Sequence, residues 1–592
     1  MARVATKSRP WRPGRLLLYR MRGSNRRKYI LLALVLVLVL RAIFHAFRPA
    51  HNKIQYQFSV PHAALHSTNP DLSIARAEAV RAEFKWAFKR YKDVAWGKDE
   101  VLPVTGKYQT TRNGFAATLV DSLTTAMVMN LTTEVVQALD YIVNTLDFDK
   151  HDGTLVDPFE TTIRYLGSLV SAVDILDAGT LVGPIPRQSQ YREDILHKAV
   201  KLAEKLSPAF DSPLGIPWPR VNFTAHLGSH EPDSLGNVHA SRETSFAVTP
   251  ARAGSNWLEY YRLGQHATDP VYVHNATRAW ASFVWNRNEE TFDGLIDSPM
   301  DSFSGYSMGH TVSLGAGHDS YYEYLIKAAI LAPRDKHASR YRKRWEQAMT
   351  STMERLAFRG TPPDSYRADG KRSERGYLFI AQYFDGTYMN EMGHLTCYIA
   401  GNLILGGRYL QRNDLVTFGL EVLETCHATY VTATGLGPES FVWEPPRRDP
   451  TTGQHVLDGG YEQVRWAISA PGPHEHEQVR KLGFWVSDAR YFLRPEVIEG
   501  YFYAYRVTGD PKYQEWAWSA FEGLRKFSKV TYGFGEIQDV TLPDGGGITV
   551  DSSESFFLAE TLKYLFLIFD DPDRFNLDEW VLSTEAHPFR IE

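Results

Sequence analysis

Three absences narrow the class of this protein. The first 47 of its 592 positions contain no acidic residue, although 11 of the 65 lysines and arginines lie there. The remainder therefore has 54 basic against 69 acidic side chains, a net charge of −15, which argues against nucleic acid as a partner. The chain has only two cysteines, so at most one internal disulfide can form. No small-residue cleavage site follows the one long apolar run, which argues against a cleaved signal peptide.

The N-terminus has the pattern of a membrane anchor. Residues 1–28 are basic, and residues 29–47 are mostly apolar, with Arg41 able to extend its charged end to the far interface. Because a basic flank stays in the cytosol, we expect a single-pass type II protein with a cytosolic tail, a transmembrane helix at 29–47 and a stem at 48–72. Residues 73–592 would then form one domain in the lumen of the endoplasmic reticulum or Golgi.

Two further features fit the lumen of the secretory pathway. Glycosylation sequons begin at Asn130, Asn222 and Asn275. Cys397 and Cys426 both lie in helix-like sequence, and an oxidising compartment allows them to pair. The alternative is two buried free thiols. A disulfide that closes this loop would stabilise the fold by roughly 3–4 kcal/mol if its effect is that of chain entropy.

The body of the chain repeats a unit of two helices joined by a short polar turn. The clearest copies are at 254–272 and 499–513, where an apolar and aromatic helix is followed by Asp-Pro and then by a tyrosine. Convincing alternating strands are few. About seven helix pairs in one chain predict an all-α toroid of helix pairs, with an open solenoid as the alternative arrangement. The other pairs can be drawn at 117–147, 160–206, 320–358, 390–430 and 555–582.

Three long polar stretches separate some of these pairs, at 207–250, 284–318 and 434–490. Loops on a rigid scaffold carry function, so we expect ligand-binding groups there. The third stretch includes alternating histidine and glutamate at 474–477. This spacing fits no usual zinc pattern, and the neighbouring proline and glycine favour a solvated loop.

Acidic residues recur inside the most apolar and aromatic segments. Asp319 and Glu323 lie among tyrosines, Glu496 and Glu499 follow an aromatic run, and Glu560 lies in a phenylalanine-rich segment. Burying an unpaired carboxylate costs several kcal/mol, so inward carboxylates that share a cavity usually do chemistry or bind a polar ligand. Because aromatic rings surround them, we interpret the pattern as a sugar site.

Eight motif blocks follow one another along the body of the chain. They are Ala95–Glu100, Phe159–Gly167, Asp319–Leu325, Met392–Cys397, Gly435–Glu439, Leu493–Glu496, Glu554–Lys563 and Ser583–Pro588. In this order they closely resemble the class I α-1,2-mannosidases, glycoside hydrolase family 47. The resemblance covers almost the whole body, and so many collinear blocks are very specific. It implies an (α/α)7 barrel with the site in its core, and the two cysteines fall where the family has its disulfide.

The resemblance also implies an activity, which is removal of α-1,2-linked mannose from high-mannose N-glycans with inversion and with bound Ca2+. Inversion needs a base that activates water and an acid that protonates the leaving oxygen. Glu496 matches the base, although a helix-start carboxylate is the alternative. Thr584 matches the calcium ligand, although it also fits a cap before a turn. Calcium takes six to eight oxygens, so Glu499, Glu560 and Glu585 would hold its waters and meet the substrate.

Other positions match family residues with different roles. Asp319 matches a third catalytic carboxylate, which positions groups or relays a proton near the scissile bond. Arg494 and Glu439 would contact sugar hydroxyls. Phe556 would pack on a pyranose face, with plain core packing as the alternative. His394 would contact the site, with a satisfied core histidine as the alternative.

Two family positions are not filled as the resemblance predicts. The family's general acid lies in a block of the form Ala-Glu-x-x-Ser/Thr, which here runs from Ala251 to Ser255 with Arg252 at the acid position. Arginine cannot donate a proton at physiological pH, and loss of a general acid typically costs a factor of about 100 to 10,000. The second departure is Thr124, where the family tends to have an acid.

The sequence leaves three explanations of Arg252 open. Asp319, or Glu243 from a loop, supplies the proton, and the chain is a working hydrolase. Alternatively, Arg252 pairs with Asp319, and the chain is a weakly active or inactive membrane-anchored glycan-binding protein. The third is a slipped alignment, which the matching residues on either side argue against. A purely structural helical toroid would leave the matched motifs without a reason.

Overall fold

A computed structural model describes residues 69–592 except 154, 182, 232–245, 286–289, 361, 364–375, 446–454, 458–459, 463–464 and 468–471. The chain divides into two compact units, Met1–Tyr56 and Gln57–Glu592. The predicted tail and transmembrane helix, and all but the end of the stem, lie outside the described residues. In the part that is described, no helix is long and apolar enough to cross a membrane. The first described helix begins at Pro70, slightly before the predicted domain start at Ser73.

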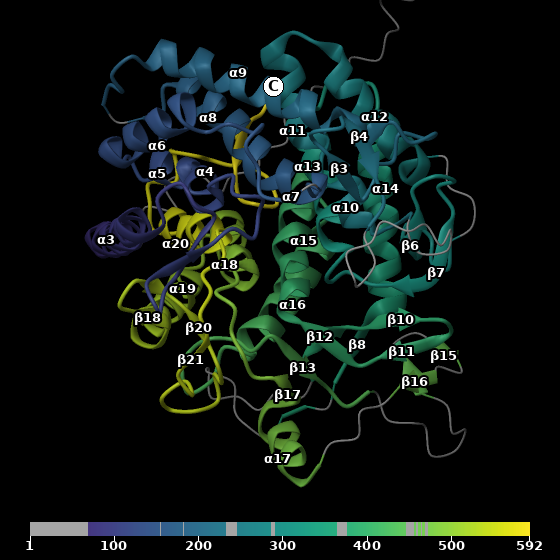
Figure 1. Cartoon of the computed structure of the whole chain (residues 1–592). Coiled ribbons are helices and arrows are strands. Elements are labelled where there is room, and N and C mark those ends of the chain that lie inside the picture. Colours follow the sequence, from purple (N-terminus) through teal and green to yellow (C-terminus); the bar gives the residue numbers. More distant parts are fainter. Residues whose placement is uncertain are drawn as a thin grey trace, which may run out of the picture. The chain divides into compact units, whose positions relative to one another are not determined.

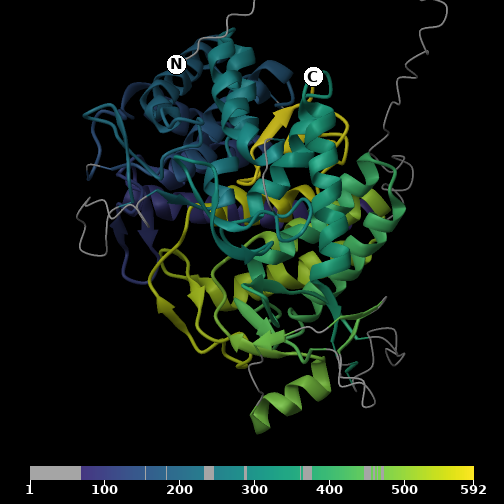
Figure 2. The same cartoon turned by 90° about the vertical axis from the view of Figure 1, so that its right-hand side faces the viewer.

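Seven helices of the second unit form a closed inner ring (Figures 1 and 2). Each packs against the next, and the last packs against the first. This closure confirms the predicted toroid of helix pairs and excludes the open solenoid. In ring order the helices are α5 (Leu123–Val128), α8 (Gly167–Ala178), α11 (Trp257–Ala267), α13 (Asp319–Leu331), α15 (Tyr398–Tyr409), α18 (Glu496–Thr508) and α20 (Leu562–Leu567).

Each inner helix has one outer partner, and the two kinds of helix are buried differently. Helix α13 is buried at every residue after its first, as an inner helix must be. Helix α9 instead buries one stripe, which includes Tyr191, Ile195, Ala199 and Leu202, and exposes its polar face. The outer helices are α6 (Thr132–Asn144), α9 (Gln188–Leu206), α12 (Pro270–Val284), α14 (Ala338–Ser351), α16 (Asn413–Ala428), α19 (Lys512–Gly523) and α3 (Pro70–Ala95).

The repeated Asp-Pro turns start outer helices, as their sequence suggests. The Asp269 carboxylate accepts a hydrogen bond from the Val271 N–H at 2.9 Å, and Pro270 is the first residue of α12. The Asp510 carboxylate accepts from the Lys512 N–H, also at 2.9 Å, at the start of α19. An aspartate that caps free backbone N–H groups, followed by a proline that has none to satisfy, defines a helix start.

The predicted helix pair at 555–582 is wrong. The outer partner of α20 is α3, from the opposite end of the domain, and the chain after α20 turns into a hairpin. Its strands are β22 (Trp580–Leu582) and β23 (Pro588–Arg590), paired antiparallel. The hairpin is anchored to α8, because the Ser171 hydroxyl donates to the Pro588 carbonyl at 2.6 Å and the Arg590 N–H donates to Asp174 at 3.0 Å.

The chain has more strands than its sequence predicts. A six-stranded sheet runs in the order β16-β11-β10-β7-β6-β5, and a three-stranded sheet in the order β12-β13-β17. Most of these strands have two to four residues, which is too short for an alternating pattern to stand out. The strands are β5 (Ala247–Val248), β6 (Ser298–Asp301), β7 (Ser307–Val312), β10 (Gln382–Phe384), β11 (Thr387–Met389), β16 (Arg465–Ala467), β12 (Glu391–Gly393), β13 (Ser440–Val442) and β17 (Trp485–Asp488).

The histidine and glutamate run at 474–477 belongs to a helix, so the predicted loop is wrong, although His476 and Glu477 are exposed to solvent as predicted. Helix α17 (Pro473–Leu482) begins with a proline and ends before Gly483, whose positive φ suits a helix C-terminus. Glu475 lies in its first turn, and basic residues lie in its last turn, as the helix dipole favours. Val479 packs against Val442 and Trp485.

Candidate active site

A cavity of about 330 Å3 lies among the inner helices. It is lined by residues of α13, α18, the irregular helices η1 (Thr161–Leu166) and η6 (Phe557–Thr561), and the turn between β22 and β23. Three arginines also face it, from separate segments. The carboxylates on its wall are Glu160, Asp319, Glu323, Glu496, Glu499, Glu560 and Glu585, and the arginines are Arg164, Arg252 and Arg494. The structure thus brings together most of the acids that the sequence singled out.

Glu496 is the first residue of α18 and faces the cavity directly after Pro495. Its Oε2 lies 2.7 Å from Nδ1 of His394, which belongs to the short helix η4 (His394–Cys397). Burial opposes ionisation of Glu496. The hydrogen bond from His394, together with the charge of Arg494, outweighs burial, so the pKa of Glu496 is lowered. Glu496 is therefore an ionised carboxylate, which is the state that a general base needs.

Asp319 is the first residue of α13 and lines the same cavity. One carboxylate oxygen accepts from the Ser320 N–H at 2.8 Å. Burial, reinforced by the charges of Glu323 and Glu496, raises the pKa of Asp319 to about 7. This carboxyl therefore keeps its proton to a much higher pH than an ordinary aspartate, and such a group can act as a general acid.

Thr584 lies in the turn between β22 and β23 and reaches the cavity wall. Its N–H donates to the Tyr324 hydroxyl at 3.4 Å, and that hydroxyl donates to Glu259 at 2.5 Å. Both partners come from buried inner helices, α13 and α11. The anchored hairpin and these contacts hold the threonine at the cavity.

Burial disfavours the charge of three carboxylates near this turn, and for Glu560 the charges of Glu585 and Glu499 add to the effect. Burial is the main cause that raises the pKa of Glu499 to about 8, of Glu585 to about 8 and of Glu560 well above its usual value. A divalent cation beside Thr584 would let all three ionise, so this oxygen-rich set fits calcium. The resemblance puts water between the carboxylates and the ion. The described residues contain no group of three or more His, Cys, Asp or Glu placed to hold a metal directly.

Arg252 lies in the short helix α10 (Pro250–Gly254) and lines the cavity without pairing with Asp319. Its guanidinium is 3.0 Å from the Asp157 carboxylate and 3.7 Å from Glu231. Arg220 binds the same two carboxylates, at 2.7 Å and 2.5 Å. The predicted pairing of Arg252 with Asp319 is therefore wrong, because a closer acid takes the guanidinium. The other predicted proton donor, Glu243, lies outside the described residues.

Thr124 lies behind the cavity and contacts two buried basic groups. Its hydroxyl accepts from Nζ of Lys563 at 3.0 Å and lies 2.9 Å from Nδ1 of His587. Burial lowers the pKa of Lys563 to about 7 and that of His587 to about 4. The second departure from the family pattern therefore leaves a neutral hydroxyl where an acid would pair with Lys563.

The predicted sugar-binding residues divide into two groups. Phe556 and Arg494 line the cavity, and the Arg164 guanidinium stands 5.9 Å from the Phe556 ring. Glu439 is held by Arg494 through two hydrogen bonds of 2.6 and 2.7 Å, and neither Glu439 nor His394 lines the cavity. His394 instead supports Glu496 from behind, through the contact given above.

The sequence reading missed two charged residues of the wall, Glu160 and Arg164. Glu160 and Arg164 form an ion pair of 2.8 Å one helical turn apart, a spacing that is visible within the matched block. Burial opposes ionisation of Glu160, but nearby arginines, Arg164 first among them, lower its pKa to about 2. Glu323 pairs with the buried Lys327, also one turn along its helix. Charge spacing in the motif blocks could have identified all of these pairs.

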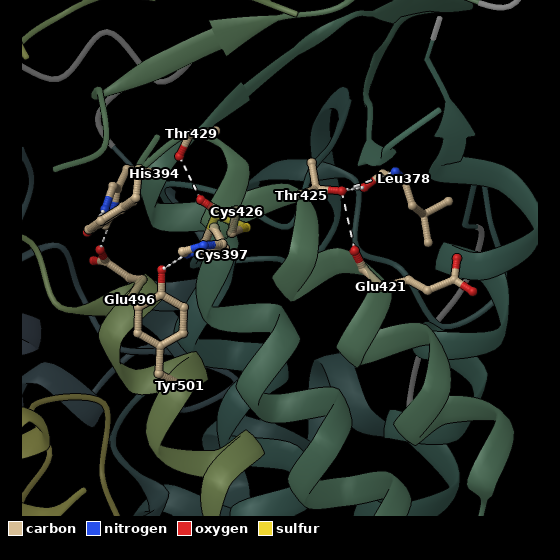
Figure 3. The surroundings of a disulfide bond; sticks show 11 residues. Leu378, His394, Cys397, Glu421, Thr425, Cys426, Thr429, Glu496 and Tyr501 are labelled. Carbon is tan, nitrogen blue, oxygen red and sulfur yellow. Dashed lines mark hydrogen bonds and ion pairs between the residues drawn. A yellow bond between two sulfur atoms is a disulfide. The ribbon is translucent and has the colours of Figure 1, made fainter. Parts of the chain in front are cut away.

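Cys397 and Cys426 form a disulfide, as the resemblance implies, with a Cα–Cα distance of 6.0 Å (Figure 3). The bond joins the end of η4 to the outer helix α16. The alternative of two free thiols is thereby excluded.

A closed ring of helix pairs around a cavity lined with carboxylates is an architecture of glycoside hydrolases. The sequence model of glycosyl hydrolase family 47 matches residues 83–591. The chain is therefore a glycoside hydrolase and belongs to family 47, as its motif blocks indicate.

Individual relatives agree with this assignment. The chain is 35% identical over 534 residues to a probable mannosyl-oligosaccharide α-1,2-mannosidase 1B of Aspergillus niger, covering 88% of this chain and 93% of that protein. It is 36% identical over 543 residues to mannosyl-oligosaccharide α-1,2-mannosidase 1B of Aspergillus phoenicis, covering 90% and 95%. Among solved structures, an α-1,2-mannosidase from Trichoderma reesei superposes with a TM-score of 0.74 at 31% identity, covering 88% and 99%.

Proposed function

We propose that this family 47 hydrolase is an inverting, calcium-dependent α-1,2-mannosidase that trims mannose from high-mannose N-glycans. The observation that carries the proposal is that two carboxylates on one cavity wall have pKa values shifted in opposite directions. The pKa of Glu496 is lowered against its burial by His394, whereas burial raises that of Asp319 to about 7. An ionised base and a protonated acid in one cavity are the pair that inverting hydrolysis requires.

In this proposal Glu496 takes a proton from a water molecule as the water oxygen bonds to the anomeric carbon of the terminal mannose. The bond from that carbon to the glycosidic oxygen breaks, and Asp319 donates its proton to the leaving oxygen. Arg494 and Phe556 line the cavity and would hold the sugar ring by hydrogen bonds and by packing. Arg252 holds no transferable proton at neutral pH, so its part is confined to contacts with the sugars.

Calcium would be held by Thr584, with Glu499, Glu560 and Glu585 binding its water ligands. When bound, the ion would supply positive charge that orders sugar hydroxyls and water in the cavity. The support for this part of the proposal is the family and the cluster of three carboxylates whose pKa values burial raises.

The second candidate function is that of a weakly active or inactive glycan-binding protein. One observation favours it: the family's acid position is occupied by Arg252, which forms an ion pair with Asp157. In that case the protein would still bind calcium and mannose in the cavity but would hydrolyse the glycan slowly. The basic and apolar N-terminus supports a signal anchor at 29–47, with residues 73–592 in the lumen of the endoplasmic reticulum or Golgi, for either function.

The test is mannose release by residues 48–592, a fragment that contains the whole second unit from Gln57. The fragment is incubated with a high-mannose N-glycan, with calcium or with a chelator, and the sugar's anomeric form is followed by NMR. We expect calcium-dependent release of the inverted anomer. Arg252→Glu, which restores the family's acid, should release mannose about 10 to 100 times faster.

Each result decides between the two functions. Release by the unaltered fragment would overturn the inactive-binder alternative. Release only after Arg252→Glu would overturn the working hydrolase with Asp319 as acid. Release that a chelator does not reduce would overturn the calcium requirement, provided that the chelator removes all bound metal.

A further inference from the structure

His394 uses both of its ring nitrogens in buried hydrogen bonds. Nδ1 lies 2.7 Å from Oε2 of Glu496, and Nε2 lies 2.8 Å from the hydroxyl of Tyr430. His394 is 2% exposed and Tyr430 is 5% exposed, so water does not compete freely for these contacts. Figure 3 shows His394 and Glu496 facing each other beside the disulfide.

Tyr491 packs beside Tyr430 and contacts the segment that carries the base. The ring centroids of Tyr430 and Tyr491 are 6.5 Å apart, and the Tyr491 hydroxyl donates to the Arg494 carbonyl at 3.0 Å. Arg494 precedes Glu496 by two residues. Tyr430 is thus packed next to the backbone segment that carries the base.

The disulfide holds the two segments that supply His394 and Tyr430. Cys397 ends the helix η4 that begins with His394, and Cys426 lies one helical turn before Tyr430. The covalent bond therefore limits how far the histidine and the tyrosine can separate. Tyr430 is therefore held next to His394 by the disulfide as well as by packing.

The chemistry of the groups determines where the protons lie. An ionised carboxylate can only accept hydrogen bonds, so Nδ1 of His394 must carry a hydrogen toward Glu496. Nε2 of a neutral ring then has a free lone pair, which the Tyr430 hydroxyl fills by donation. A hydroxyl at position 430 thereby selects the one neutral tautomer that can donate to Glu496.

We propose that Tyr430 is a positioning residue for the base. Through its hydrogen bond to His394, Tyr430 fixes the tautomer of the histidine ring in which Nδ1 donates to Oε2 of Glu496. The other oxygen of Glu496 is then free for the water nucleophile. The proposal rests on the proposed role of Glu496 as base. Within the described residues, the side chain that hydrogen-bonds to Glu496 does so at Oε2. The remaining oxygen is the one available to the cavity.

Loss of the Tyr430 hydroxyl should make the opposite tautomer competitive, and Glu496 would then lose its donor. Four other charged groups would still act on Glu496. They are Arg494, two residues before it, Asp319 on α13, and Glu499 and Glu560 beside the cavity. Because three of these four are acidic, the carboxylate without its donor should bind a proton more readily.

The test compares Tyr430→Phe with Tyr501→Phe in the full chain. Tyr501 is a matched control, because this buried tyrosine has its hydroxyl 2.8 Å from Nδ1 of the half-buried His427, in a second tyrosine and histidine pair that does not touch Glu496. For Tyr430→Phe we expect kcat to fall about 5- to 30-fold with KM nearly unchanged, and the acid limb of the kcat/KM profile to rise by about one pH unit. For Tyr501→Phe we expect neither change.

A double-mutant cycle separates positioning from general damage. His394→Asn keeps an N–H that can face Glu496 but has no second nitrogen for Tyr430, so Tyr430→Phe should have no further effect on the pH profile in that background. An unchanged acid limb in Tyr430→Phe, or equal effects with and without His394→Asn, would overturn the proposal.

Two measurements distinguish failure of this proposal from failure of the proposed function. If Glu496→Gln retains full activity, the role of Glu496 as base fails. Ring 15N shifts of His394 in labelled protein, assigned with His394→Asn, still report the tautomer without any turnover. A protonated Nδ1 that becomes mixed with protonated Nε2 in Tyr430→Phe supports tautomer control, and an unchanged ring spectrum overturns it.

Discussion

The two sides of the cavity differ in how they depart from the family pattern. On the base side, Glu496 keeps its expected identity, and its Oε2 is bonded to a buried histidine. On the acid side, an arginine replaces the expected acid, and two acids and a second arginine surround it. The comparison teaches that the arginine on the acid side is compensated by its neighbours. Asp157 and Glu231 balance the charges of Arg252 and Arg220, so the substitution is neutralised where it stands.

This local neutralisation explains why Asp319 can still hold a proton. A free guanidinium close to Asp319 would favour the ionised carboxylate and lower its pKa. The guanidinium instead lies against Asp157, and the groups that act most on Asp319 are its buried surroundings and neighbouring acids. The acid side can therefore supply a proton from α13 in place of α10.

The largest effect should come from Asp319→Asn, which removes the proposed proton donor. We expect kcat/KM to fall about 100- to 1,000-fold, because an amide cannot protonate the leaving oxygen. The unaltered enzyme should lose activity as pH rises through about 7, where Asp319 gives up its proton, and the variant should not show this alkaline limb. Initial rates of mannose release between pH 5 and 9 would measure both effects.

Asp297→Asn is a suitable control for that variant. Asp297 is also a buried aspartate, but it accepts from Thr291 and does not line the cavity. If Asp319→Asn kept both its rate and its alkaline limb, the proton would have to come from another group, and Glu243 would become the leading candidate.

A smaller effect should follow Asp157→Asn, which weakens the hold on Arg252. The asparagine can still cap α7 (Pro158–Glu160), but it no longer carries a charge for the guanidinium. Arg252 would then be freer to approach Asp319, whose pKa would fall. We expect the alkaline limb of kcat/KM to move down by about one pH unit and the rate at pH 7 to fall about 5-fold.

The matched control here is Glu231→Gln, which removes the more distant partner of Arg252, at 3.7 Å, and leaves Asp157 in place. It should shift the pH profile far less than Asp157→Asn does. Equal shifts in the two variants would mean that Asp157 has no special part in restraining Arg252.

The helix pairs could be predicted from sequence because their signals are local. Apolar residues recur at helical spacing, and Asp269 and Asp510 mark helix starts next to prolines. The partner of α20 could not be predicted this way, because α3 lies at the other end of the domain and no short-range pattern links them. The strands were missed because they are short, and α17 because its polar sequence resembles a loop.

The candidate site shows the same division between local and distant information. Glu496, Asp319 and Thr584 could be named from motif blocks, and the structure brings them to one cavity. The partner of Arg252 could not be named, because Asp157 is almost a hundred residues away and nothing in the sequence near either residue points to the other. Contacts between distant segments depend on how the helices close the ring.

The smallest effect should come from a substitution of Thr124, the second position that departs from the family pattern. Here the charge of the neighbouring Lys563 is not balanced locally, whereas the charge of Arg252 is. Nζ of Lys563 donates to the Thr124 hydroxyl and to the Ala586 carbonyl, both neutral, and burial lowers the pKa of Lys563 to about 7. Because the unfolded chain binds this proton up to about pH 10, the folded state should gain stability as pH rises from 7 to 10.

Thr124→Asp should remove much of that pH dependence, because a carboxylate would restore the proton on Lys563 in the folded state. We expect the unfolding temperature to rise by about 1–3 °C at pH 7 and by less near pH 10, measured calorimetrically at saturating calcium. Thr124→Asn, of similar shape but without charge, should keep the slope of the unaltered chain. Equal slopes for the aspartate and asparagine variants would show that Lys563 is already balanced by the acids beyond Thr124, and that both departures are neutralised locally.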